Sequence, residues 1–343
     1  MGVELVILVA IVVLAPLLFP KVSENLEAFL FAAGLLAATL TSSWSLRLLR
    51  DALVGPLTIT GAVLGASFLF YLLQRPLEAG VSRLRARLGL RPLVFALVAV
   101  VGLLSSFVTA IVASLVMVEA VERLKLDARN ERLVAVLACF AIGLGAALTP
   151  FGEPLAAVAI SKLSGEPYRA GTWFLLRTLW PFVIPGVLVS SLLSVVLLRR
   201  DGAAAVPEGP DERETPVSVL LRTGKVYIFV VGLILLGAAF TPVVDRFVGS
   251  TSYLALFWAN ITSAFLDNAT LTAAEIVPAM SQKQIVASLM GLLIAGGMLV
   301  PGNIPNIVAA GRLKIDSRAW ARIGIPVGLA MMVVMFAVLA ARA

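Results

Sequence analysis

The chain has 343 residues, of which 60% are hydrophobic and 14% are charged, and its mean hydropathy is +1.02. A water-soluble domain of this size does not reach such a balance, so the composition excludes a soluble globular protein and indicates one whose solvent is the lipid bilayer. The net charge of +7 does not indicate a nucleic-acid partner, because the basic residues lie in short loops between apolar stretches. With no histidine and a single cysteine, Cys139, the sequence also excludes imidazole chemistry and an intrachain disulfide.

Apolar stretches of about 20 residues recur along the chain, and each is long enough to cross a hydrocarbon core of about 30 Å as a helix. Only helices satisfy the backbone of such segments within the segment itself, so the sequence predicts an all-α integral membrane protein with about eight spanning helices. The expected spans are residues 2–20, 27–46, 53–74, 132–149, 172–198, 224–243, 284–301 and 320–341.

Two pairs of similar segments predict an internal repeat. Residues 105–110 (SSFVTA) parallel 263–268 (SAFLDN), and 145–154 (GAALTPFGEP) align without a gap to 296–305 (GGMLVPGNIP). The two pairs occur in the same order and at a similar separation, as in secondary transporters built from two halves. The expected divisions are N-terminal helices over 1–52, a first inverted repeat over 53–198, a cytoplasmic linker over 199–223 and a second inverted repeat over 224–343.

Charge placement predicts how the repeats lie in the membrane. The stretch 93–121 is flanked by 75–91, with five Lys/Arg residues, and by 122–132, with four. Positive charge marks cytoplasmic segments, so both flanks are expected inside. The intervening chain must then leave and return as a re-entrant hairpin with its tip at 105–109. The corresponding stretch 249–279 lacks such basic flanks and is expected to enter from outside, which would make the halves inverted.

The repeated Gly- and Pro-rich segments 145–154 and 296–305 would break a helix inside the membrane. Broken helices at that depth are tolerated where they line a cavity or a site, so both segments are candidate site walls. Ordinary helix kinks or close helix contacts are the alternative interpretation. Together these features predict two re-entrant hairpins and two broken helices.

Three acidic residues, Glu153, Asp267 and Glu275, fall within the broken apolar segments. A charge at the bilayer centre costs about 2.5–3.5 kcal/mol on insertion scales, so it usually faces a cavity and has a function. Asp267 adjoins Asn268 at a predicted hairpin tip. Carboxylate and amide oxygens suit a hard cation such as Na⁺, so Asp267 is a candidate ion ligand. A helix cap is the alternative interpretation. Glu153 would complete the site across a pseudo-two-fold axis or carry a proton. Glu275 shares a helix face with Asp267 or lies near the outer interface.

Amides and hydroxyls near the breaks complete the candidate ion- or substrate-binding set. Asn303 and Asn306 offer amides where the backbone is open. The hydroxyl candidates are Thr109, Thr149, Ser105, Ser263 and Thr270. A threonine such as Thr109 can instead bond its own helix backbone, which is the alternative for that position.

The run SAFLDNAT followed by GGMLVPGNIPN resembles the ion transporter superfamily, which includes sodium/proton antiporters, arsenite exporters and carriers of citrate and dicarboxylates. The likeness is closest to a group of small prokaryotic proteins regarded as cation transporters, and it covers about residues 53–342. The resemblance implies opposed hairpins, broken helices and a homodimer. It departs from the family in two places: SSFVTA lacks the Asp-Asn pair that antiporters often carry, and Glu153 stands where members often have Asp. Neither hairpin has the Ser-Asn-Thr signature of the dicarboxylate carriers.

These observations favour a secondary transporter that exchanges Na⁺ or a similar cation for H⁺ by alternating access, in the plasma membrane of a prokaryote. Export of an anion, oxyanion or organic acid by the same fold is the second hypothesis, and an intramembrane enzyme is the third. The sequence contains no phosphate-binding loop of the kind that ATP-driven pumps use. We expect no enzymatic activity and no cofactor other than bound Na⁺. The expected partners are a small inorganic ion, the lipid bilayer and a second copy of the chain, and no nucleic acid.

Overall fold

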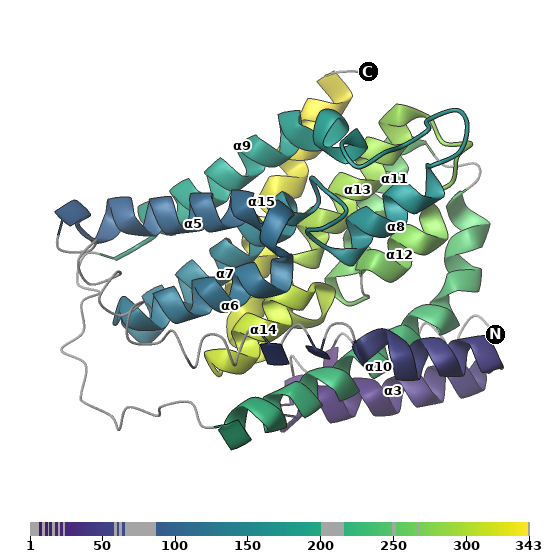
Figure 1. The fold of residues 1–343 in the computed structure, drawn as a ribbon, viewed down its shortest axis with the longest axis horizontal. Helices are drawn as coiled ribbons and strands as arrows, with labels where there is room; N and C mark the ends of the chain where they lie inside the picture. Colours follow the sequence, from purple (N-terminus) through teal and green to yellow (C-terminus); the bar gives the residue numbers. More distant parts are fainter. Residues whose placement is uncertain are drawn as a thin grey trace.

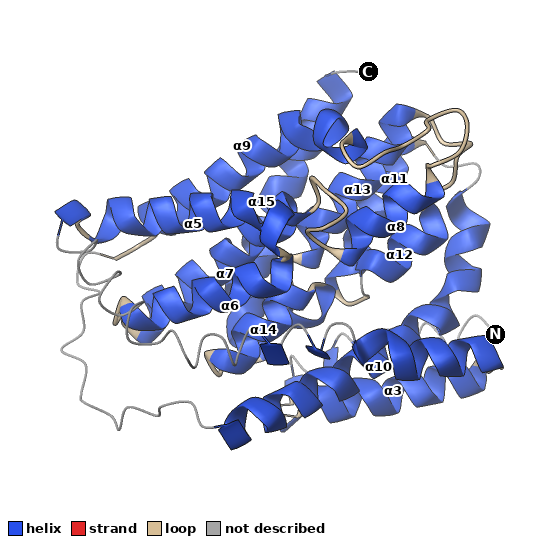
Figure 2. Ribbon diagram, viewed as in Figure 1, coloured by secondary structure: helices blue, strands red, loops and turns tan. Residues whose placement is uncertain are grey.

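The computed structural model describes the chain in several stretches, and every regular element within them is a helix (Figure 2). The described residues are 7–8, 11–12, 14–15, 18–19, 21–22, 25–57, 60–61, 64–65, 87–199, 216–248, 252–266 and 268–341. This all-helical architecture confirms the predicted fold class at its coarsest level.

Three described helices are long and apolar enough to cross a bilayer: α5 (Leu90–Val108), α9 (Phe174–Val196) and α15 (Ser317–Ala341). Each of the three exposes large apolar side chains on its outward face. An extensive exposed apolar surface is stable against lipid and is rare on soluble monomers. The protein is therefore an all-helical protein with the character of a membrane protein.

The chain reverses direction at Thr109, between α5 and α6 (Ala110–Arg123), and the two helices pack against one another (Figure 1). Thr109 has a φ of 76°, which is rare and strained for a β-branched residue. Two hydrogen bonds hold the turn: the N–H of Val112 donates to the Thr109 hydroxyl at 3.3 Å, and the N–H of Ala110 donates to the carbonyl of Gly152 at 2.7 Å. The turn lies at the end of the tip expected from the sequence, although the α5 arm is by itself long enough to cross a membrane.

Two apolar helices are interrupted at the Gly- and Pro-rich segments. The first interruption separates α7 (Ala128–Ala146) from α8 (Pro154–Lys162). The second separates α13 (Gln282–Gly296) from α14 (Ile304–Arg312), with a short 3-10 turn, η2 (Val300–Gly302), between them. Both later helices carry proline in their first two positions, where a missing N–H breaks no helical hydrogen bond.

Other described helices lie around the two interrupted helices. Figure 1 shows α3 (Leu26–Leu40) lying along α10 (Pro216–Val248) at one edge of the molecule. In the second half, α11 (Tyr253–Ala259) continues into the 3-10 helix η1 (Asn260–Ala264), and α12 (Asn268–Glu275) follows.

Some expected elements have different bounds or lie outside the described residues. Helix α10 begins at Pro216, so the last part of the stretch 199–223, expected as a linker, is helical. The expected span 53–74 lies largely outside the described residues, and 2–20 does so in part.

Residues from three helices meet at one end of the molecule, which we call the basic end. At the start of α5, the Arg91 guanidinium donates to the carbonyl of Leu198, which follows α9, at 3.3 Å. Near the start of α7, the side-chain oxygen of Asn130 accepts from the N–H of Arg199 at 3.2 Å. The start of α5, the start of α7 and the end of α9 therefore lie together.

A different pair of loops meets away from the basic end. The hydroxyl of Tyr168, between α8 and α9, donates to the carbonyl of Met280, between α12 and α13. This hydrogen bond places the two loops side by side (Figure 1).

The core is centred on α7 and α13, whose residues are almost all buried. The ring of Phe140 on α7 lies directly against Gly297, the residue after α13, where a β carbon would overlap the ring. The indole N–H of Trp320 on α15 donates to the carbonyl of Gly297 at 3.1 Å. These contacts hold the end of α13 against the middle of α7 and against α15.

Candidate functional site

A cavity of about 250 Å³ lies where the α5–α6 turn meets both helix interruptions. Four of the residues expected at the site line it: Thr109, Glu153, Asn268 and Asn303. They come from segments far apart in the sequence, two from each half. The structure therefore brings together a hydroxyl, a carboxylate and two amides at a single cavity.

Four helices begin at this cavity. Thr109, Glu153 and Asn303 are the N-cap residues of α6, α8 and α14, and Asn268 is the first residue of α12. The start of a helix presents unsatisfied N–H groups and about half a positive charge. The four N-termini therefore create a positive potential that favours a carboxylate or another anionic group at this position.

Glu153 is the carboxylate that lines the cavity among the described residues, and its side chain is buried. Its backbone is extended, with φ −153° and ψ 160°, and Pro154 starts the next helix immediately afterwards. The Pro-bounded interruption is the local reason that an acidic side chain sits inside the bundle and not on a helix surface. Asp267, the strongest candidate from the sequence, lies outside the described residues, although its neighbour Asn268 lines the cavity.

The two cavity amides lie in crowded surroundings. Asn303 packs against Gly143 of α7, where a β carbon would lie 2.5 Å from the Asn303 Nδ2 atom. Glycine at this position makes room for the amide. The Nδ2 atom of Asn268 is buried and has no hydrogen-bond partner within the described residues. An unsatisfied buried donor of this kind costs about 1–3 kcal/mol, so it is suited to a ligand or a water molecule.

Three further candidates support the cavity walls and do not line the cavity. The Ser105 hydroxyl donates to the Ile142 carbonyl at 3.0 Å, and it thereby fastens α5 to α7. The Thr149 hydroxyl donates to the Ser106 carbonyl, so it ties the first interruption to the end of α5. The Asn306 amide donates to the Gly296 carbonyl at 2.7 Å and to the Leu299 carbonyl at 2.8 Å, bridging the second interruption.

Two oxygen atoms beside Gly296 lack hydrogen-bond partners among the described residues. They are the Oδ1 atom of Asn306 and the hydroxyl of Ser263, and both are fully buried. Ser263 lies close enough that a β carbon on Gly296 would be 3.5 Å from its Oγ atom. Buried oxygens without donors suit a dehydrated cation. For Thr270 only the backbone is described, as part of α12.

Glu275 lies apart from the cavity, at the last residue of α12. Its Oε2 atom accepts from the Asn260 amide at 2.9 Å, and the same amide donates to the Ser288 carbonyl at 3.0 Å. The sequence analysis did not single out Asn260 or Ser288. The available signal was weak: a polar residue within the apolar runs FWANI and VASLM.

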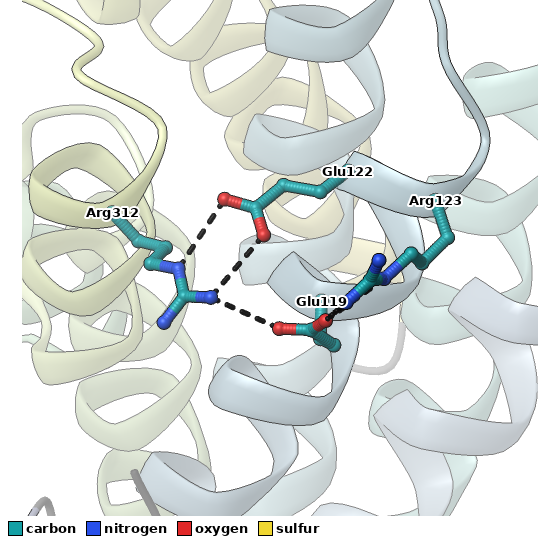
Figure 3. A network of polar contacts seen from close by, with 4 residues as sticks. All are labelled: Glu119, Glu122, Arg123 and Arg312. Carbon is teal, nitrogen blue, oxygen red and sulfur yellow. Dashed lines mark hydrogen bonds and ion pairs between the residues drawn. The ribbon is translucent and has the colours of Figure 1, made fainter. Parts of the chain in front are cut away.

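A partly buried ionic network was also missed by the sequence analysis (Figure 3). Glu119 of α6 accepts from Arg123 of the same helix at 2.6 Å and from Arg312 of α14 at 3.0 Å. Arg312 also contacts Glu122 at 3.3 Å. The Glu119 side chain is only 5% exposed and that of Arg312 is 10% exposed, whereas Arg123 and Glu122 are 22% and 33% exposed. The cluster is therefore buried at Glu119 and partly exposed at its edge. The spacing of Glu119 and Arg123 was a signal for one pair, but nothing local indicated Arg312.

Comparison with known families adds one finding to this geometry. A family model described as "Protein of unknown function (DUF1646)" matches residues 1–341. The chain belongs to this family. A search of the curated proteins found none that matches the chain. Because the family's description states no activity, the functional argument depends on the cavity and its residues.

Proposed function

We propose that this member of the family is a secondary active transporter that exchanges Na⁺ or a similar cation for H⁺ by alternating access. The observation that carries the proposal is the cavity at which the hairpin turn, both helix interruptions and the buried Glu153 meet. Interrupted helices around a buried site are the construction that secondary transporters use for ions. We place the protein in the plasma membrane of a prokaryote as a homodimer, within the ion transporter superfamily.

In our proposal the chain forms two inverted repeats with about eight spans, and the helix packing supports the repeat. The second arm of the first hairpin, α6, packs on α14, the helix after the second interruption, and α12 packs in the same way on α8. In our proposal a pseudo-two-fold axis relates these pairs. The basic end, with Arg91, Asn130 and Arg312 near it, is then cytoplasmic, and the loops joined by Tyr168 and Met280 face outside.

In the proposed cycle, one carboxylate holds either a proton or the cation. Glu153 and, by sequence, Asp267 supply the negative charge. The oxygens of Ser263 and Asn306 that lack donors lie behind the cavity wall, beside Gly296. In our proposal they would replace part of the hydration shell of Na⁺ held by Asp267, the residue that follows Leu266 in the same segment as Ser263. Protons and cations compete for the same carboxylates, so cation uptake should slow at acid pH. Alternating access then requires the cavity to open toward each face in turn.

A second candidate function is export of an anion or oxyanion by the same fold. Two observations favour it: the four helix N-termini that meet at the cavity and the buried Asn268 donor without a partner. Both features suit a negatively charged group. In this version Asp267 would bind a coupling ion.

Ion flux in proteoliposomes tests the proposal and separates the two candidates. Na⁺, Li⁺, K⁺ and oxyanions are compared under an imposed pH gradient. We expect Na⁺- or Li⁺-dependent proton flux that Asp267→Asn abolishes and Glu153→Gln reduces. Glu166→Gln is the matched control, because Glu166 is an exposed glutamate that pairs with Arg169 outside the cavity. Near-normal flux in Asp267→Asn at equal protein levels would reject the proposed mechanism, and oxyanion counterflow without a cation requirement would favour the second candidate.

A further inference from the structure

A second buried polar cluster lies between η1, α12 and α13, and none of its residues lines the cavity. It consists of Asn260, Glu275 and Ser288, which are 1%, 4% and 0% exposed. Gly291, one turn after Ser288, permits the close approach of the chain that carries Asn260. A β carbon on Gly291 would lie 2.7 Å from the Phe257 carbonyl oxygen. The cluster is thus part of the packed interior.

The hydrogen bonds fix how the Asn260 amide is oriented. Its Nδ2 atom donates to the Glu275 carboxylate at 2.9 Å and to the Ser288 carbonyl at 3.0 Å. Both partners accept hydrogen bonds, so the nitrogen must face them. The Oδ1 atom of Asn260 is then left buried without a partner among the described residues. The Ser288 hydroxyl lies beside the Glu275 carboxylate.

The charge of Glu275 is poorly compensated by the protein. Glu275 is the last residue of α12, where the helix dipole is unfavourable to a negative charge. In the described part of the chain, no lysine or arginine forms an ion pair with it. A buried carboxylate without a cationic partner is costly, so this arrangement requires a positive partner from outside the protein or a proton.

The chemistry of the cluster fits a monovalent cation. A carboxylate, an amide oxygen and a hydroxyl are hard oxygen ligands, and a cation contacts several of them at once. A proton on Glu275 would neutralise the charge but would supply a single hydrogen bond, whereas a cation contacts several oxygens. A divalent ion would need more negative charge, and within the described residues no three His, Cys, Asp or Glu side chains lie together in a way that could hold a metal ion.

We propose that Glu275, Asn260 and Ser288 form a second cation site, separate from the transport cavity, that binds dehydrated Na⁺ or Li⁺. The bound cation joins η1 and α12 to α13 and thereby stabilises the second half of the molecule. This inference goes beyond the proposed function, because the cation would hold these helices together whether or not the cavity transports ions.

Thermal unfolding of the purified full chain in detergent tests this site. The background variant carries Asp267→Asn and Glu153→Gln, which removes both carboxylates assigned to transport. NaCl, LiCl, KCl and choline chloride are compared at equal ionic strength. We expect Na⁺ and Li⁺ to raise the unfolding temperature of this background above its value in choline, and adding Glu275→Gln to remove the rise. Adding Glu166→Gln, the exposed control, should leave the rise unchanged.

A milder variant and a second measurement guard against misfolding. Ser288→Ala removes one hydroxyl beside the Glu275 carboxylate and leaves the backbone carbonyl that Asn260 contacts in place, so the fold should survive. We expect the apparent Na⁺ affinity to fall about tenfold, the effect of losing one modest interaction. In the otherwise intact chain, Glu275→Gln should lower equilibrium binding of radioactive sodium by one ion per chain. The proposal is overturned if the background shows no rise over choline, or if the rise survives Glu275→Gln. Loss of flux with this rise intact would reject only the transport function.

Discussion

Two helix pairs with similar packing are held together by different forces. Helices α6 and α14 are joined by the ion cluster of Glu119, Glu122, Arg123 and Arg312 (Figure 3). Among the described residues, no ion pair joins α8 to α12. Near the far end of that pair the polar link is the neutral hydrogen bond from Tyr168 to a loop carbonyl.

Under the proposed alternating-access mechanism, this difference predicts which pair stays fixed. Separating α6 from α14 would take Arg312 away from both Glu119 and Glu122, whereas breaking one neutral hydrogen bond costs little. We therefore expect α6 and α14 to move as a unit and α8 and α12 to separate more readily. Glu153 and Asn268, at the N-termini of the looser pair, would then change their environment as the pair moves.

The largest effect should come from cysteine labelling, because each position is either accessible or inaccessible from a given face of the membrane. The experiment tests whether the ends of the α5–α6 hairpin and the start of α13 lie on opposite faces. Cys139 is first replaced by Ser, which keeps a donor for the weak 3.4 Å contact to the Pro305 carbonyl. Single cysteines at Ala86, Ala128 and Ser281 are then treated with an impermeant thiol reagent. Positions 86 and 128 should label from the cytoplasm and 281 from outside. Labelling of 86 and 128 from opposite faces would break the inverted scheme.

Arg312→Gln should destabilise the protein strongly, because Glu119 would keep only Arg123 as a cationic partner. Leaving a buried charge with no partner typically costs about 3–5 kcal/mol, and the Arg123 that remains should keep the loss at or below the lower end of that range. The measurement is reversible unfolding in mixed micelles. Arg169→Gln is the control, since Arg169 forms an exposed pair with Glu166 that should contribute about 0–1 kcal/mol. Equal effects of the two variants would mean that the α6–α14 cluster does not fasten the pair.

Gly143→Ala should displace a residue that lines the cavity, because the β carbon of the new alanine would overlap the Asn303 amide. Overpacking of this kind usually costs about 1–3 kcal/mol, and the displaced amide should also weaken ion binding. Gly311→Ala is the matched control: Gly311 lies in α14 and has open space around it, so alanine should be neutral or slightly stabilising there. Flux and unfolding temperature are measured for both. If Gly143→Ala behaves like Gly311→Ala, the Asn303 position tolerates movement and contributes little to the site.

The smallest effect is expected for Tyr168→Phe, which removes the hydroxyl that bonds to the Met280 carbonyl. One neutral hydrogen bond contributes about 0.5–1.5 kcal/mol, so the unfolding temperature should fall only slightly. If α8 and α12 separate during transport, the variant should also change the turnover rate clearly, although its unfolding temperature changes little. Tyr253→Phe serves as the control for ring replacement. A loss as large as that of Arg312→Gln would contradict the comparison between the two pairs.

Much of the fold could be predicted from local sequence features. Apolar length predicted helices, and the Gly- and Pro-rich segments predicted the interruptions between α7 and α8 and between α13 and α14. These features act on the backbone of the segment itself, so they can be recognised without knowing the neighbours. The same reasoning selected Thr109, Glu153, Asn268 and Asn303, which the structure places at one cavity. Asp267 stays a prediction.

Pairing between distant helix faces could not be predicted in this way. Nothing in the sequence around Glu119 singles it out, and only the packing of α6 on α14 buries it against Arg312, 193 residues away in sequence. Likewise, Glu275 was recognised as an acid in an apolar segment, but its partners Asn260 and Ser288 come from other helices. Composition and local breaks determine where the backbone can be helical. Which buried charges meet depends on how the helix faces pack, and that was decided by the tertiary structure alone.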